Sequence, residues 1–261
     1  MMRRFALKIG KLGTGLVAAF LAVAPAHAAS FIVTYEAAGA THTTAGFDYT
    51  GVETFDGLAT GVRSFTSDFG GSSITGTYSS VNILASDQYG GAGGSNYAVA
   101  GLGVGSNSYS ISFAQTGDAG INYFGYWLSA LDAGNAVTFF NGESAVFTFT
   151  PTNVLDLIGG DLAYYGKPGT GQNSSEPYVF LNFFYEGGTF DRIVFTQQRS
   201  ANGGYAGYES DNHTVGFYND IGGGTPVSGI PEPVTWMMMI LGFGMVGAAI
   251  RRRQAVVAVN A

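Results

Sequence analysis

Short runs in which apolar and polar residues alternate recur along the middle of the chain. In "SYSISF" at 108–113, three apolar side chains fall on one face and three serines on the other, and "AVFTFT" at 145–150 repeats the pattern. Successive side chains of a strand point to opposite faces, so this period of two predicts half-buried strands. Aromatic and β-branched runs at 135–141, 178–185 and 190–197 are also of strand length.

Turn-forming residues separate these runs, as in "NGE" at 141–143 and "EGG" at 186–188. Only "TNVLDLI" at 152–158 predicts a helical turn or two, with Thr152 as the N-cap after Pro151. Many short strands with almost no helix predict an all-β fold. We expect a single, jelly-roll-like β-sandwich.

Two glycine-rich stretches predict breaks in this pattern. The segment 87–108 is dense in glycine and indicates either a long loop or an edge region of the sheet. The segment 221–230 is typical of a flexible linker. We therefore place the β-sandwich body at 29–220 and the linker directly after it.

The N-terminal 28 residues have the three parts of a secretory signal peptide. Basic residues are followed by an apolar run and by the small residues Ala26 and Ala28. Positive charges stay on the cytoplasmic side, and small side chains fit the signal peptidase cleft. We expect signal peptidase to cleave after Ala28.

The body is strongly acidic. Residues 36–220 hold 17 acidic side chains and four Lys or Arg, a net formal charge of −13. This charge repels nucleic acid and anionic lipid, so we expect no nucleic-acid partner. The chain has no cysteine, which excludes thiolate catalysis and disulfides.

A short apolar run lies near the C-terminus. Residues 234–250 carry no charge and would make a helix of about 25 Å, slightly less than the hydrocarbon core of a bilayer. Arg251, Arg252 and Arg253 follow, and the positive-inside rule keeps them cytoplasmic. The run predicts a transmembrane helix, and a permanent anchor is one interpretation of it.

The order of motifs in this region supports a second interpretation. Pro231, Glu232 and Pro233, the run "TWMMMILGFGMVGAA" and the Arg251–Arg253 triplet resemble the PEP-CTERM sorting signal of Gram-negative bacteria. The sorting signal then spans 231–253, with a short tail at 254–261. The resemblance implies export through the inner membrane, transient anchoring, and cutting near Pro-Glu-Pro by an exosortase. It also implies a place at the cell surface or in the extracellular matrix, among exopolysaccharide and biofilm.

The body carries a second resemblance. Segments 122–142, 177–197 and 208–218 are similar to a family of exosortase-dependent bacterial surface proteins. This resemblance implies a β-rich body, and it implies no particular enzymatic reaction.

Catalytic motifs are absent from the body. "GLGVGS" at 101–106 lacks the following Lys-Thr or Lys-Ser of a phosphate loop, and no nucleophile elbow occurs. His42 and His213 lie far apart in the sequence and in no metalloprotease pattern. We assign no catalytic residues and expect no enzyme. A secreted enzyme that acts on polysaccharide is the alternative.

Structural Ca²⁺ is the one cofactor that the sequence suggests. Glu53 and Asp56 lie near the start of the body, and Glu209 and Asp211 near its end. Ca²⁺ prefers carboxylate and carbonyl oxygens. By analogy with sugar-binding jelly-rolls, these four acids form one candidate site, and solvated turn acids are the other interpretation.

Glycan contact requires exposed aromatic rings. Trp127, Tyr164 and Tyr165 are the candidates, although core packing is the competing explanation for Trp127. The expected function is thus a structural or adhesive role in exopolysaccharide. The alternatives are the polysaccharide-acting enzyme and a stably membrane-anchored periplasmic protein.

Overall fold

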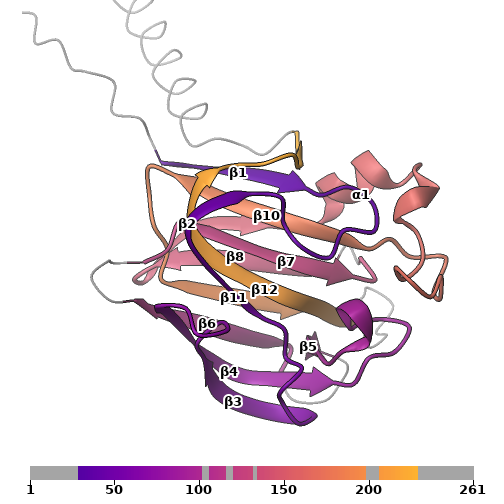
Figure 1. The fold of residues 1–261 in the computed structure, drawn as a ribbon, viewed down its shortest axis with the longest axis horizontal. Coiled ribbons are helices and arrows are strands. Elements are labelled where there is room, and N and C mark those ends of the chain that lie inside the picture. Colours follow the sequence, from indigo (N-terminus) through magenta and orange to yellow (C-terminus); the bar gives the residue numbers. More distant parts are fainter. Residues whose placement is uncertain (1–28, 102–105, 116–119, 132–133, 198–205, 229–261) are drawn as a thin grey trace, which may run out of the picture.

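The body folds into antiparallel β-structure. The computed structural model describes residues 29–101, 106–115, 120–131, 134–197 and 206–228 (Figure 1). The strands found there are β1 (Ser30–Tyr35), β2 (Gly46–Glu53), β3 (Gly61–Ser67), β4 (Ile74–Leu84), β5 (Tyr97–Gly101), β6 (Ser108–Gln115), β7 (Tyr123–Ser129), β8 (Asn135–Asn141), β9 (Ser144–Phe149), β10 (Val179–Glu186), β11 (Arg192–Gln197), β12 (Gly207–Asp220) and β13 (Thr225–Pro226). One α-helix, α1 (Thr152–Ile158), and two 3₁₀ turns, Ala92–Gly94 and Leu162–Tyr164, lie between them.

The strands form one continuous sheet in the order β13-β1-β10-β7-β12-β5-β4-β6-β11-β8-β9. Strand β2 pairs with β12, and β3 pairs with β4. The sheet curls on itself (Figure 1), because each strand is twisted relative to its neighbour. The prediction of an all-β fold is confirmed.

Aromatic rings fill the inside of the curl. Phe139 of β8 lies 5.1 Å from Phe183 of β10, and Phe195 of β11 lies 6.0 Å from Phe124 of β7. All four side chains are fully buried. Each such pair contributes about 1 kcal/mol beyond the burial of its surface. The two ends of the sheet therefore share one aromatic core.

The predicted alternation is confirmed in β6 and β9. Tyr109, Ile111 and Phe113 are buried, whereas the intervening serines face outward. The predicted helix is also present. However, its N-cap is Pro151, whose side chain has no atom that accepts a capping hydrogen bond, and Thr152 is already helical. The φ of Pro151, −72°, fits a helix, so helical geometry begins one residue earlier than expected.

The interpretation of the glycine-rich stretch as a loop or sheet edge is wrong for residues 97–101. These residues form β5, an interior strand that pairs with β12 on one side and β4 on the other. All five are buried. Ala98, Ala100 and Gly101 have small side chains, so the segment gives little alternating hydrophobic signal.

The first and last described strands lie side by side. Thr34 of β1 pairs with Pro226 of β13, and the Val227 amide donates to the Val33 carbonyl at 2.9 Å. The sheet thus extends into the segment predicted as a linker. Both ends of the described body leave from this edge, which is uppermost in Figure 1.

The signal peptide and the sorting signal lie outside the described residues. This applies to Ala26, Ala28, the Pro231–Pro233 motif and the Arg251–Arg253 triplet. In the part of the chain that the structure describes, no helix is long and apolar enough to span a bilayer.

Candidate functional site

Two loops cover the outer face of strands β7 and β10. We call residues 85–96, between β4 and β5, the glycine-rich loop, and residues 159–178, between α1 and β10, the crossover loop. Beneath them Trp127, Tyr178 and Phe180 form a second buried cluster with Ala92. The rings of Trp127 and Tyr178 stack with centroids 5.6 Å apart. The two loops are therefore seated on a rigid aromatic base.

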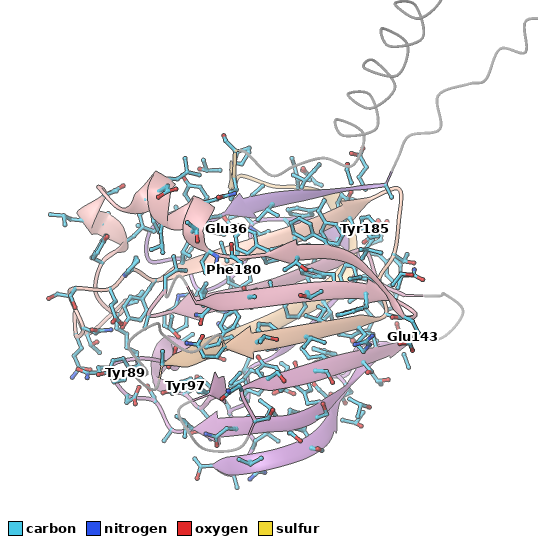
Figure 2. All side chains as sticks on the ribbon, turned by 180° about the vertical axis from the view of Figure 1, so that it is seen from behind. Glu36, Tyr89, Tyr97, Glu143, Phe180 and Tyr185 are labelled. Carbon is cyan, nitrogen blue, oxygen red and sulfur yellow. The ribbon has the colours of Figure 1, made fainter. Side chains whose placement is uncertain are left out.

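Glycine is required at two positions of the glycine-rich loop. A Cβ on Gly90 would lie 2.3 Å from the ring of Tyr97, and Gly91 has a φ of +88°. Tyr97 in turn donates its hydroxyl to Oδ1 of Asp87 at 3.0 Å. Tyr89 and Tyr97 lie at one end of the molecule in Figure 2, opposite Glu143. The loop is thus closely packed at this end.

Lys167 fastens the crossover loop to the glycine-rich loop. Its Nζ donates to Oγ of Ser86 at 2.6 Å and to the carbonyls of Asp87 and Gly90, both at 2.8 Å. An ammonium has three donors, and all three are used here. Burial lowers the pKa of Lys167, although Asp87 and Asp211 oppose this effect. Lys167 therefore links the two loops, and its ammonium group is surrounded by neutral oxygen acceptors.

Two further contacts hold the glycine-rich loop. The Tyr178 hydroxyl donates to the Gln88 carbonyl at 2.6 Å, and the Ala92 amide donates to Oδ2 of Asp211 at 2.7 Å. Asp211 is fully buried. Burial raises the pKa of its carboxyl to about 7, although the amide donors of Ala92 and Asn212 favour the ionised form. The loop is thus fixed along its length before any ligand binds.

A cleft of about 370 Å³ opens between the two loops. It is lined by residues 86–87 and 93–94 of the glycine-rich loop and by residues 167–170 and Gln172 of the crossover loop. Its polar groups are the Asp87 carboxylate, hydroxyls, an amide, the exposed backbone of glycines and the Lys167 ammonium, whose three donors are already engaged. This set can hydrogen-bond a neutral ligand rich in hydroxyls, because carboxylate and carbonyl oxygens accept from hydroxyls and amide groups donate to them.

The structure separates the predicted glycan residues from this cleft. Trp127 is 1% exposed, so its ring packs within the molecule and reaches no glycan from this position. Tyr164 is half-buried and donates to the Glu36 carbonyl at 3.1 Å. Tyr165 donates to the Gly159 carbonyl at 3.2 Å. The lining of the cleft includes none of the three.

The acids of the predicted calcium site lie in the same region. Glu53 of β2 pairs directly with His213 of β12, so early and late strands meet as expected. Asp56 raises the pKa of Asp211 through charge repulsion, which places the two acids near each other. Nevertheless, no three His, Asp or Glu side chains among the described residues are grouped closely enough to hold a metal. Calcium binding at Glu53, Asp56, Glu209 and Asp211 stays a prediction.

His213 belongs to a polar network inside the core. Its Nδ1 lies 3.0 Å from the Tyr78 hydroxyl and its Nε2 lies 3.0 Å from Oγ of Ser210, which is 2.9 Å from the Tyr109 hydroxyl. Burial lowers the pKa of His213 to about 3. Neither Ser210 nor His213 is exposed to solvent. This hydroxyl–imidazole pair is thus closed to a substrate.

The residues that build the cleft were not predicted from the sequence. Asp87, Lys167, Thr170 and Gln172 lie in two segments separated by about half of the body, and only the fold brings them together. One available signal was Lys167 itself, because a lysine is rare in so acidic a body. Its Lys-Pro-Gly context also indicated a turn.

Comparisons with known proteins give little for this chain. No family model matches it, and no curated protein matches it. Among solved structures it is similar to the K2 cleaved adhesin domain of Lys-gingipain (Kgp), with a TM-score of 0.36 and 18% identity over 64% of this chain and 98% of that chain. At this TM-score, the likeness assigns neither a fold nor a function to the chain.

Proposed function

We propose that the chain is an exported, exosortase-processed surface or extracellular-matrix protein with an adhesive or structural role in exopolysaccharide. The proposed location outside the inner membrane is based on the resemblance of residues 231–253 to the PEP-CTERM signal and on the signal peptide expected at 1–28. We also propose a single jelly-roll-like β-sandwich as the architecture of the body. The packing of β8 against β10 across the core supports this architecture.

The observation that carries the adhesive role is the cleft between the glycine-rich loop and the crossover loop. Hydrogen bonds of Lys167 and Asp211 hold its walls in place. Ligand binding therefore requires little further ordering of the two loops and loses little conformational entropy. The exposed polar groups of the cleft include the side chains of Thr170, whose hydroxyl accepts from the Gln172 backbone amide, and of Gln172. A short segment of neutral saccharide fits this chemistry and this size.

The test is retention on exopolysaccharide isolated from the native cells. We expect the processed protein to be retained without shortening the polymer. Replacing both Thr170→Ala and Gln172→Ala removes two exposed polar groups and should weaken retention about tenfold. Glu143→Ala is the matched control, since Glu143 is exposed at the opposite end of the molecule (Figure 2). Equal retention of both variants would rule out the cleft as the binding site.

The same experiment distinguishes the alternatives. A polysaccharide-acting enzyme would shorten the polymer, which size-exclusion chromatography detects. A stably anchored periplasmic protein would stay in the membrane fraction. Replacing Pro231, Glu232 and Pro233 by alanine should trap the protein in that fraction if the sorting signal operates. An unchanged distribution would count against exosortase processing.

A further inference from the structure

Six adjacent strands of the sheet contain no acidic residue. They are β3, β4, β6, β11, β8 and β9, in that spatial order. The 17 acidic side chains between residues 36 and 220 lie outside these six strands, and Asp68, Glu143 and Asp191 lie directly next to the ends of β3, β9 and β11. Strands β1, β5, β7 and β13 also lack acidic residues. The inner sides of these strands contribute to the aromatic core, whereas their outer sides carry mainly serine and threonine. We call this outer surface the hydroxyl face.

One row of the hydroxyl face crosses five strands. Ser79 pairs with Ser110, Ser110 with Val194, Val194 with Thr138, and Thr138 with Thr148. The hydroxyls of Ser79 and Ser110 are 2.6 Å apart, and those of Thr138 and Thr148 are 3.1 Å apart. Four hydroxyls thus lie on one line across the sheet.

A second row runs parallel to the first. Thr66 pairs with Thr77, Thr77 with Ser112, Ser112 with Arg192, and Arg192 with Phe140. The hydroxyls of Thr66 and Thr77 are 3.1 Å apart. The guanidinium of Arg192 lies over the Phe140 ring, 3.9 Å from its centroid. The row therefore ends in a cation laid flat against an aromatic ring.

Strand geometry makes these rows a regular array. Neighbouring strands lie about 4.8 Å apart, and alternate residues of one strand lie about 6.7 Å apart. A hydroxyl has one donor and two acceptor positions, so a pair of hydroxyls that share one hydrogen bond can still bind further groups. The hydroxyl face thus presents a two-dimensional set of hydroxyl donors and acceptors, with the Arg192 cation near the end of the second row.

We infer that the hydroxyl face binds the side of a neutral polysaccharide chain or bundle. The charge distribution selects this partner: a body of net charge −13 repels anionic polymers, whereas the strands of this face carry no carboxylate. Neutral sugar hydroxyls complement such a surface. Strands β3, β4 and β6 lie at the bottom of Figure 1, opposite β1 and β13. This part of the face stays accessible when the protein is held by either end.

This inference rests on the proposed adhesive function and adds a second contact to the cleft. The cleft is sized for a short saccharide segment, whereas the hydroxyl face contacts a polymer along its length. The two contacts therefore respond to different probes: soluble oligosaccharide for the cleft and insoluble polymer for the face.

Pull-down of the processed protein with insoluble cellulose, a neutral polysaccharide, tests the inference. Thr77→Glu and Thr148→Glu each place a carboxylate on the hydroxyl face, and both positions are exposed. We expect each to weaken retention about tenfold, because a carboxylate must lose water against the polymer. Thr225→Glu adds the same charge at an exposed position of β13, outside both the hydroxyl face and the cleft, and should bind as the parent does. Equal thermal midpoints of the three variants will show that each is folded.

Two results would overturn the inference. One is retention of Thr77→Glu and Thr148→Glu at the parent level. The other is equal retention of the parent on cellulose and on alginate, an anionic polymer. If the face variants bind normally while the Thr170 and Gln172 variant loses binding to native exopolysaccharide, the hydroxyl face fails and the adhesive function stands. If the parent binds neither polymer nor native exopolysaccharide, both proposals fail.

Discussion

Asp211 and His213 lie two residues apart on β12, yet their side chains are buried on opposite faces of the sheet. Asp211 points outward and accepts a hydrogen bond from Ala92 of the glycine-rich loop. His213 points inward and contacts the core rings of Phe195 and Tyr126. A bulge at Asn212, whose φ is +49°, makes this arrangement possible.

Burial shifts the two pKa values in opposite directions, and this predicts a compensated pH dependence. The pKa of Asp211 rises from 3.8 to about 7, so its contribution to stability is complete below pH 3.8 and declines as pH rises to about 7. The pKa of His213 falls from 6.5 to about 3, so its contribution is complete above pH 6.5 and is lost as pH falls to about 3. Between pH 4 and 6.5 the two slopes cancel.

Single substitutions should reveal each slope in urea unfolding. In Asp211→Asn, the free energy of unfolding should rise with pH between 4 and 6.5 by about 1 kcal/mol per pH unit, because only His213 remains. In His213→Gln, it should fall over the same window. The difference between each variant and the parent removes the contribution of all other groups. Parallel profiles for parent and variants would contradict the assignment.

Lys167→Met should loosen the glycine-rich loop. The change removes three hydrogen bonds, to Oγ of Ser86 and to the carbonyls of Asp87 and Gly90. These oxygens must then either bind water or stay without a donor. We expect the free energy of unfolding to fall by about 2 kcal/mol and proteolysis within residues 85–96 to accelerate. Arg63→Met is the control, because the Arg63 guanidinium makes only one hydrogen bond among the described residues, to the Thr60 carbonyl. Unchanged proteolysis would show that Lys167 does not hold the loop.

Two buried asparagines should respond oppositely to the same substitution. Within the described part of the chain, neither polar side-chain atom of Asn135 has a hydrogen-bond partner, although the residue is fully buried. Asn135→Leu should therefore raise the free energy of unfolding by about 1 kcal/mol. Asn182 instead bonds Tyr123, Thr34 and Glu36. Asn182→Leu should lower the free energy of unfolding by about 3 kcal/mol, because it leaves these partners buried and unpaired.

A denaturant series on both variants measures the two effects. Opposite signs of the change are the predicted result. If both substitutions destabilised the protein equally, Asn135 would have a partner that the geometry does not show.

The strands could be predicted where apolar and polar residues alternate, as in β6 and β9. Strand β5 could not, because "YAVAG" consists mostly of small residues and its burial depends on β12 and β4 beside it. The pattern also gives no strand order, because each strand's partner is set by contacts distant in the sequence. The single curled sheet therefore emerged only from the structure.

The candidate site was harder to predict than the fold. Exposed aromatic rings were the sequence criterion for glycan contact, but the abundance of aromatics reflects a need for core, as the burial of Trp127 shows. The cleft depends instead on Lys167 meeting three backbone or hydroxyl oxygens of a loop about 80 residues earlier. No local pattern encodes such a contact.

Mass spectrometry of the protein recovered from its native cells tests the central claim most directly. We predict an N-terminus at Ala29 and a C-terminus near Pro231–Pro233, with the protein in the extracellular or surface fraction. Such a result would leave the β-rich body, with its cleft and hydroxyl face, free to meet polysaccharide outside the cell. A chain that still ends at Ala261 and stays in the inner-membrane fraction would contradict the account.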